Sequence, residues 1–412
     1  MNPFLEKPIS LENFFENWKV IYPRAYNKFE VDPYTRARII LMNGTEVEAI
    51  FFAHQFARNC CDNNLRREIA VGRRLDQQQQ KVISVLKPID ETILEHTIGY
   101  EQLAVDLTAA LAQREPDPYV KIALDFALLE DFDHLYRYSD LAYLEYGEKM
   151  EYLVNHYTEI MPGRPTIAQH RFPEDNIRRY IDFKTACPIT KLNIAIITAA
   201  EQQTMNYYMN VVNLYCSDLG RKLYQEIASI EEQHVSQYES LLDPNLSWLE
   251  NLLVHKYNEC YLYYSCFCDE VDPCIKKIWE YHFIQEVSQL HKAAQLLEKY
   301  EGKCWQQVIP NGEFPELLKL RPNKEYIREI EKNTVEWTSK LEDYVDVNCL
   351  CNEDVFYQFQ DAVNGNECEV PSHQVIDSLI NQTGMDYRFE IAPHPVEALR
   401  NRQVDNTCIA RS

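Results

Sequence analysis

The fold is decided by the stretch Tyr224-Gln225-Glu226-Ile227-Ala228-Ser229-Ile230-Glu231-Glu232-Gln233-His234-Val235-Ser236-Gln237-Tyr238. Apolar and aromatic residues recur there at every third or fourth position, as they do on one face of an α-helix. Glu231 and His234 fall on that same face, one turn apart. A helix formed here therefore turns a carboxylate and an imidazole toward the interior of the protein.

The same pattern occurs one hundred residues earlier in the chain. Two other predicted helices carry one acid each on the buried face, Glu101 and Glu201. The corresponding positions are Glu101 and Glu201, Asp131 and Glu231, His134 and His234, and Tyr138 and Tyr238. A constant offset at so many positions indicates an internal duplication of a helix hairpin, or two hairpins under the same geometric demand.

Segments with helical periodicity dominate residues 90–300, and three short turns interrupt them. The turns lie at 115–118, 217–220 and 243–245. One connection is much longer, because residues 161–188 contain four prolines and a glycine. Two helix hairpins joined by one long crossover predict an all-α fold with a ferritin-like four-helix bundle.

Additional helices are expected on both sides of this bundle. Residues 45–61 and 65–86 have helical periodicity after an irregular lead-in, residues 252–293 read as another hairpin, and residues 324–345 fit one more helix. The predicted division is 1–88, an N-terminal helical extension; 89–245, the bundle; 246–302, an additional hairpin packed on the bundle; and 303–412, a C-terminal extension of unknown role.

The charge of the chain argues against nucleic-acid and membrane partners. With 41 basic and 64 acidic residues, the formal net charge is −23, which repels phosphate backbones and anionic lipids. No apolar run reaches the length of a membrane span, and the first ten residues do not resemble a secretory signal. We therefore expect a cytoplasmic protein, and most of its 13 scattered cysteines should be free thiols.

Six side chains of the predicted bundle suit a pair of metal ions. Burying four ionised carboxylates without counter-charge costs several kcal/mol or more per group, and two divalent cations remove this cost. Carboxylates and imidazoles are the ligands of di-iron and di-manganese sites in helix bundles. The predicted ligands are Glu101, Asp131, His134, Glu201, Glu231 and His234.

Four short motifs carry these residues: Tyr100-Glu101-Gln102, Asp131-Phe132-Asp133-His134, Ala200-Glu201-Gln202 and Glu231-Glu232-Gln233-His234. Over residues 90–242 they resemble the ferritin-like superfamily, on its rubrerythrin side. The resemblance implies that the single glutamate of each hairpin and the acid of each acid-x-x-His motif bind or bridge two irons. Each histidine completes one iron. A manganese pair or a mixed pair fits the same ligand types.

Asp131 departs from the family pattern, which has glutamate at this position. Aspartate is shorter by one methylene, and Glu130 is the alternative ligand, four residues before His134. We prefer Asp131, because Glu130 breaks the offset of one hundred. The chain has no Cys-x-x-Cys pair for a separate electron-transfer iron, and it is much longer than the storage ferritins that form shells.

Two further sets of residues carry weaker signals. Tyr138 and Tyr238 follow the histidines by one turn, and we expect them to pack in the core or to act as hydrogen-bond partners or redox-active groups. In the hairpin within residues 252–293, Glu286-x-x-Gln289 stands in place of Glu-x-x-His. This hairpin is expected to be degenerate, with His282 and Glu286 as an alternative metal site.

The predicted function is that of a di-iron oxidoreductase. A two-metal centre of this kind reacts with dioxygen or peroxide and takes electrons from a donor, while the protein fixes coordination and excludes water. We expect an enzyme, either an oxidase or peroxidase or an oxygenase on a small molecule, and a homodimer is one expected assembly. The alternative is a non-catalytic metal-binding, iron-storage or ferroxidase-type protein on the same bundle.

Overall fold

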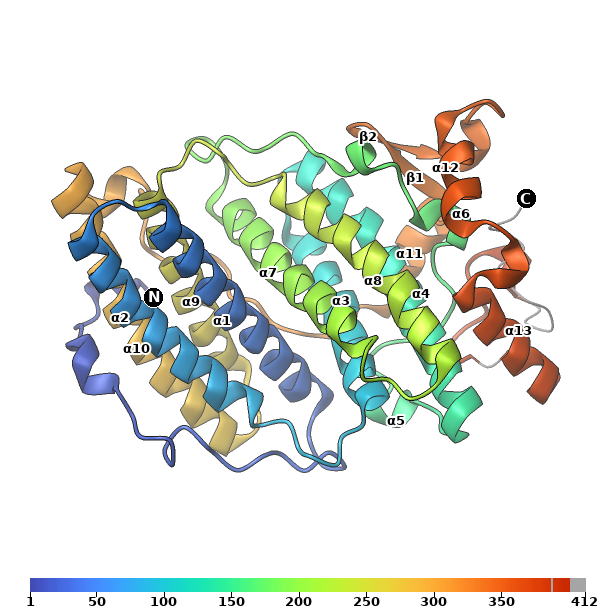
Figure 1. Cartoon of the computed structure of the whole chain (residues 1–412), viewed down its shortest axis with the longest axis horizontal. Helices are drawn as coiled ribbons and strands as arrows, with labels where there is room; N and C mark the ends of the chain where they lie inside the picture. Colours follow the sequence, from blue (N-terminus) through green and yellow to red (C-terminus); the bar gives the residue numbers. More distant parts are fainter. Residues whose placement is uncertain (387, 401–412) are drawn as a thin grey trace. The chain divides into compact units, whose positions relative to one another are not determined.

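The computed structural model describes residues 1–386 and 388–400. These residues form 13 α-helices and one two-stranded sheet (Figure 1), which confirms the prediction of an all-α chain. Residue 387 and residues 401–412, which belong to the predicted C-terminal extension, lie outside the described part. All 12 described cysteines are free thiols, as expected.

The chain divides into two compact units, each made of three separated segments. The first unit comprises Met1–Glu91, Ile181–Gln203 and Asp243–Leu320, and the second comprises Thr92–Tyr180, Thr204–Leu242 and the chain from Arg321 onward. Helix α7 (Pro188–Val211) is continuous, and its residues from Thr204 belong to the second unit. The four contiguous domains predicted from the sequence stay a prediction.

Four long helices make up most of the first unit: α1 (Pro33–Asn59), α2 (Asn63–Ser84), α9 (Trp248–Asp269) and α10 (Pro273–Glu301). Helix α1 packs against α2 and α9, and α10 packs against α9 and α2, so that the four helices close a ring (Figure 1). Aspartate or serine caps the start of each helix by accepting backbone hydrogen bonds.

The irregular lead-in is shorter than predicted. It contains the 3₁₀ turns η1 (Pro3–Leu5) and η2 (Leu11–Phe14), and Leu11 and Phe14 of η2 pack against Leu75. The prediction that helix starts at residue 45 was wrong, because α1 begins at Pro33. Asp32 caps the helix and Pro33 stands at its first position, where proline is tolerated.

The second unit is built around a hairpin of α3 (Ile93–Arg114) and α4 (Pro118–Tyr146), with α8 (Asp218–Glu239) packed against α4. The turn between α3 and α4 is the predicted one, and Asp117 caps α4 there. The long connection after α4 contains only short elements among the described residues: α5 (Glu151–Val154), α6 (Thr166–Gln169) and the 3₁₀ turn η3 (Pro173–Asn176).

The C-terminal section of the second unit corrects one prediction. Helix α11 (Lys324–Thr334) ends early, and strands β1 (Trp337–Lys340) and β2 (Asp343–Asp346) follow as an antiparallel hairpin. The single helix predicted over 324–345 was therefore wrong after Thr334. Aromatic and β-branched residues favour the strands, and Leu341 takes a positive φ of 53° in the two-residue turn.

Two further helices and four 3₁₀ turns complete the described chain. Helix α13 (Pro371–Thr383) covers α4 and α8, while α12 (Val355–Asn364) lies before it in the sequence. The turns are η4 (Trp305–Gln307) in the first unit and η5 (Val347–Cys349), η6 (Glu367–Glu369) and η7 (Glu397–Leu399) in the second.

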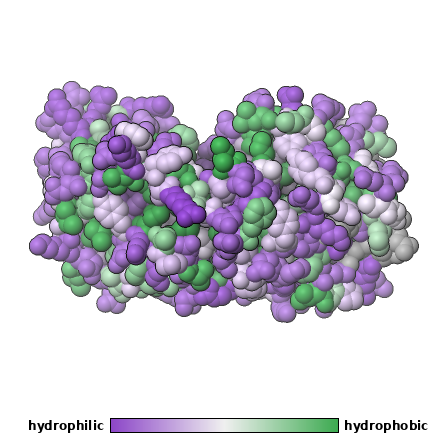
Figure 2. Space-filling model, turned by 90° about the horizontal axis from the view of Figure 1, so that it is seen from below, coloured by the Kyte–Doolittle hydropathy of each residue, from purple (hydrophilic) through white to green (hydrophobic). Residues whose placement is uncertain are grey.

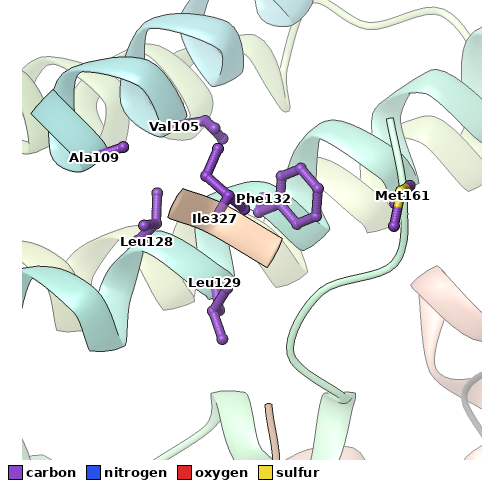
Figure 3. Close-up of a cluster of buried hydrophobic side chains, with 7 residues drawn as sticks. All are labelled: Val105, Ala109, Leu128, Leu129, Phe132, Met161 and Ile327. Carbon is purple, nitrogen blue, oxygen red and sulfur yellow. The ribbon is translucent and has the colours of Figure 1, made fainter. Parts of the chain in front are cut away.

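Helix α11 seals the outer side of the α3–α4 hairpin. Figure 3 shows Ile327 of α11 pointing toward Val105 and Phe132, in a buried cluster that also contains Leu128, Leu129, Ala109 and Met161. Hydrophilic residues cover most of the face in Figure 2, with hydrophobic residues in small patches between them. Within the described residues, every helix is too short or too polar to cross a bilayer.

Candidate metal centre

Five of the six predicted ligands lie on three helices of the second unit. Glu101 is on α3, Asp131 and His134 are on α4, and Glu231 and His234 are on α8. All five side chains have 0% exposure. The acid and the histidine of each acid-x-x-His motif lie one turn apart on one face, so the helix itself positions both donors.

One compact group contains four of these residues. Glu101, Asp131, His134 and Glu231 each offer one ligand atom, and these atoms all lie within 4.8 Å of one another. Ligand atoms bound about 2.1–2.4 Å from one ion lie at most twice that distance apart. The group is therefore small enough to surround a single cation, and its buried acids and histidine could hold a metal ion.

Asp131 and Glu231 of this group also face His234. His234 Nδ1 lies 3.2 Å from Asp131 Oδ1 and 3.3 Å from Glu231 Oε2. The rings of His134 and His234 are 6.0 Å apart and nearly parallel, and His134 Nδ1 lies 3.0 Å from Glu231 Oε1. Asp131 and Glu231 thus stand between two imidazoles, which is where carboxylates shared by two ions would stand.

Several potential metal-ligand atoms of this group have no hydrogen-bond partner among the described residues. They are both carboxylate oxygens of Asp131, Oε2 of Glu231 and Nε2 of His134. A buried polar atom left without a partner costs about 1–3 kcal/mol. Because a cation would satisfy all of these atoms at once, the residues fit a metal ion.

The acids of the site influence one another's protonation. Burial raises the pKa of Asp131, and the charge of Glu231 adds to this effect while His234 opposes it. Burial also acts to raise the pKa of Glu231, but the hydrogen bonds and charges of His134 and His234 outweigh it and hold this pKa at about 2. Glu231 is therefore the more anionic of these two acids.

Glu130, the alternative to Asp131, has partners of its own. It accepts a hydrogen bond from His234 Nε2 at 2.6 Å and another from Arg171, and Arg164 lies 3.6 Å away. These charges outweigh the effect of burial and hold the pKa of Glu130 at about 2. A carboxylate on one ring nitrogen directs the other nitrogen toward a metal, so the geometry favours Asp131 as the ligand.

The long connection after α4 supplies the two arginines. Arg164 and Arg171 are buried, and the Arg171 amide donates to Gln233 Oε1 at 2.7 Å on α8. Gln233 in turn donates to Gln169 O at 3.0 Å. This role was not predicted from the sequence, although arginines at 164, 171 and 178 recur at an interval of seven in a proline-rich segment.

Glu201 is the sixth predicted ligand. It is 1% exposed and lies on α7, in the part of that helix that belongs to the first unit. Seven residues later on the same helix, Tyr208 donates a hydrogen bond to Glu101. Residues seven apart share one face of a helix, so Glu201 lies on the same face of α7 as Tyr208. Its role as a ligand stays a prediction.

The two predicted tyrosines are fully buried. The hydroxyl of Tyr138 has no hydrogen-bond partner among the described residues, and its ring lies 5.3 Å from that of Tyr208 and 4.8 Å from that of Tyr224. Tyr238 lies on α8. Their roles beside a metal stay predictions. Tyr208, which had no role assigned from the sequence, donates a hydrogen bond to Glu101, a predicted ligand.

The first unit contains a second buried acidic cluster. Ligand atoms of Glu46, Asp76 and Glu259 lie within 4.8 Å of one another. The ammonium of Lys256 lies 2.8 Å from Asp76, 2.6 Å from Glu259 and 3.3 Å from Glu286. We call these five residues the lysine cluster. The positive charge of this cluster comes from the Lys256 side chain itself.

Neither His282 nor Glu286, the predicted alternative metal site, belongs to a compact ligand group of the described residues. His282 Nδ1 lies 3.2 Å from the Tyr263 hydroxyl, and burial lowers the pKa of His282 to about 3. Glu286 accepts a hydrogen bond from Gln289 at 2.7 Å. Glu286 is therefore paired with Lys256 and Gln289.

Of the lysine cluster, only Glu286 was singled out from the sequence. Asp76-x-x-Gln79 repeats the pattern of Glu286-x-x-Gln289, and Glu46 precedes Asp76 by 30 residues, as Glu101 precedes Asp131. This interval was the signal that could have identified Glu46 and Asp76.

No family model, curated protein or solved structure matches this chain. The resemblance to the ferritin-like superfamily therefore rests on the sequence motifs alone and stays a prediction.

Proposed function

We propose that this chain is a di-iron carboxylate oxidoreductase whose metal pair lies in a ferritin-like bundle of α3, α4, α7 and α8. One observation carries the proposal: two fully buried acids, Asp131 and Glu231, stand between two buried imidazoles. The bond from Tyr208 on α7 to Glu101 on α3 supports α7 as a helix of the bundle.

In this proposal, Glu101, Asp131, His134, Glu231 and His234 would hold the metal ions, and Glu201 is the predicted sixth ligand. We choose iron from the family resemblance. The ligand types themselves do not distinguish the two metals, because the same oxygen and nitrogen ligands accept manganese. When bound, a reduced iron pair supplies the electrons that dioxygen or peroxide takes up.

The residues of the chain would prepare this chemistry in three ways. Complete burial of the ligands excludes bulk water. Glu130, held by Arg164 and Arg171, fixes the ring of His234. Tyr208 donates to Glu101 and so fixes the orientation of its carboxylate. The donor, the cytoplasmic location and the homodimer stay predictions.

Activity of the metal-loaded protein tests the proposal. Metal-free protein is loaded with Fe(II) without oxygen, and hydrogen peroxide or dioxygen is then added with a reducing dye as electron donor. We expect repeated consumption of the oxidant, and its loss in His134→Ala. The matched control is His282→Ala, which removes an equally buried histidine outside the compact ligand groups and should retain turnover.

Two outcomes would overturn the enzymatic proposal. Rapid oxidation of the added Fe(II) without donor-dependent turnover would favour the ferroxidase or storage function. Equal turnover in His134→Ala and wild type would show that the reaction occurs elsewhere.

A further inference from the structure

A row of tyrosines leads away from the proposed metal site within the second unit. We define the tyrosine row as Tyr208, Tyr224, Tyr215 and Tyr146. Its inner member, Tyr208, is fully buried and donates its hydroxyl hydrogen to Glu101. The row therefore begins at a predicted ligand.

The middle of the row consists of closely spaced rings. The centroids of Tyr208 and Tyr224 are 5.6 Å apart, and those of Tyr224 and Tyr215 are 5.1 Å apart. Tyr224 is 0% exposed and Tyr215 is 6% exposed. These distances are those of aromatic rings in contact, so no gap interrupts the row between the ligand and Tyr215.

The row ends at the surface. The Tyr215 hydroxyl lies 3.5 Å from that of Tyr146, the last residue of α4, and the Tyr146 side chain is 51% exposed. Buried rings thus connect a predicted ligand to a phenol that molecules in solution can touch.

Each buried hydroxyl of the row has an oxygen acceptor. Tyr208 donates to Glu101, and Tyr215 donates to Glu145 at 2.5 Å. The Tyr224 hydroxyl lies 2.6 Å from Thr97 Oγ1, which itself donates to Ile93 O, so Tyr224 is the donor to Thr97. A phenol loses its proton when it loses an electron, and the Glu145 carboxylate would take the proton of Tyr215. If these buried tyrosines served only to pack, phenylalanine would suffice, because it has no hydroxyl group whose burial costs free energy.

We propose that the tyrosine row carries single electrons from a one-electron reductant in solution to the oxidised metal centre; this inference rests on the proposed function. Tyr215 gives one electron through the rings of Tyr224 and Tyr208 to the centre, and it gives its phenolic proton to Glu145. The reductant meets Tyr146 at the surface and returns one electron to Tyr215 across the contact between the two hydroxyls, and Glu145 returns the proton. Tyr215 regains its electron and its proton, so the net change is one electron transferred inward.

The test compares Tyr215→Phe and Tyr146→Phe with wild type after loading with Fe(II). Both substitutions keep the ring and remove the readily oxidised phenol. We expect unchanged metal content in both variants and a rate of donor-driven reduction at least about ten-fold lower in Tyr215→Phe. Tyr152→Phe is the matched control, because Tyr152 is an exposed tyrosine bonded to Glu95 outside the row. Its rate should equal that of wild type.

Electron paramagnetic resonance gives a second readout that does not depend on turnover. Hydrogen peroxide added without a donor should produce a tyrosyl radical in wild type, and its signal should change in both row variants. Unchanged reduction rates together with an absent or unaltered radical signal would overturn the row, while donor-dependent turnover would leave the proposed function standing. Failure to bind metal at all would overturn both.

Discussion

The two buried acidic clusters of this chain follow one pattern but differ in their cations. In the second unit, acid-x-x-His motifs on α4 and α8 bring two imidazoles to the acids. In the first unit, glutamine replaces each histidine, at Gln79 and Gln289, and the ammonium of Lys256 lies among the carboxylates.

The difference shows how buried acids are neutralised. An uncompensated carboxylate in a helix bundle is costly, so each cluster needs a positive partner. A lysine provides a permanent one, and it fills the space between Asp76 and Glu259. The second cluster has two imidazoles instead, which are metal ligands, whereas the compact group of the first unit contains only acids. We therefore infer that the second cluster is the metal site and that the lysine cluster is structural.

The largest expected effect is the loss of the lysine. Lys256→Met leaves the acids of the lysine cluster without a cation, and breaking a buried pair costs about 3–5 kcal/mol. Denaturant unfolding at neutral pH measures this loss. Lys292→Met is the matched control, since that lysine is 33% exposed and paired with Glu68, and it should cost about 1 kcal/mol or less.

The same variant has an expected pH dependence. Burial and neighbouring acids raise the pKa values of Asp76 and Glu259 in the folded protein, although Lys256 opposes this. A raised acid pKa in the folded state means that stability falls as pH rises, because the folded state resists deprotonation. The destabilisation of Lys256→Met should therefore shrink as the pH is lowered. A constant difference from wild type would argue that Lys256 acts only through packing.

A smaller effect is expected at the residue that orients the second imidazole. Glu130→Gln removes the charged acceptor of His234, and such changes weaken metal binding by about 10–100-fold. A titration with Fe(II) or Mn(II) measures the affinity. Glu226→Gln serves as the control, because Glu226 is a glutamate on α8 that pairs with Arg137 and Ser372. Equal affinity in both variants would remove Glu130 from the account.

The smallest effect tests whether the two clusters can be interconverted. Replacing Lys256 with alanine and both Gln79 and Gln289 with histidine gives the first unit the donor types of the second. We expect weak binding of additional Mn(II), with a dissociation constant on the order of micromolar to millimolar. Retention of the wild-type stoichiometry would mean that the helices of the first unit do not place these donors around an ion.

Much of this was predictable from local sequence signals. Periodicity and turn residues located most of the long helices, and the offset of one hundred identified acids and histidines that are buried together. The strands after α11 were missed because helical and strand periodicities are hard to separate in short segments. Lys256 was missed because the burial of a lysine depends on which helices surround it, and the segments that form the lysine cluster are far apart in the sequence.

The most direct test of the account is metal analysis of two alanine variants, each purified without oxygen and loaded with Fe(II). Glu231→Ala removes a buried acid of the second unit, and Glu259→Ala removes an acid of the lysine cluster. The account predicts two metal ions per chain in wild type and in Glu259→Ala, and a clear loss in Glu231→Ala. Equal metal content in wild type and Glu231→Ala, or loss in Glu259→Ala alone, would contradict it.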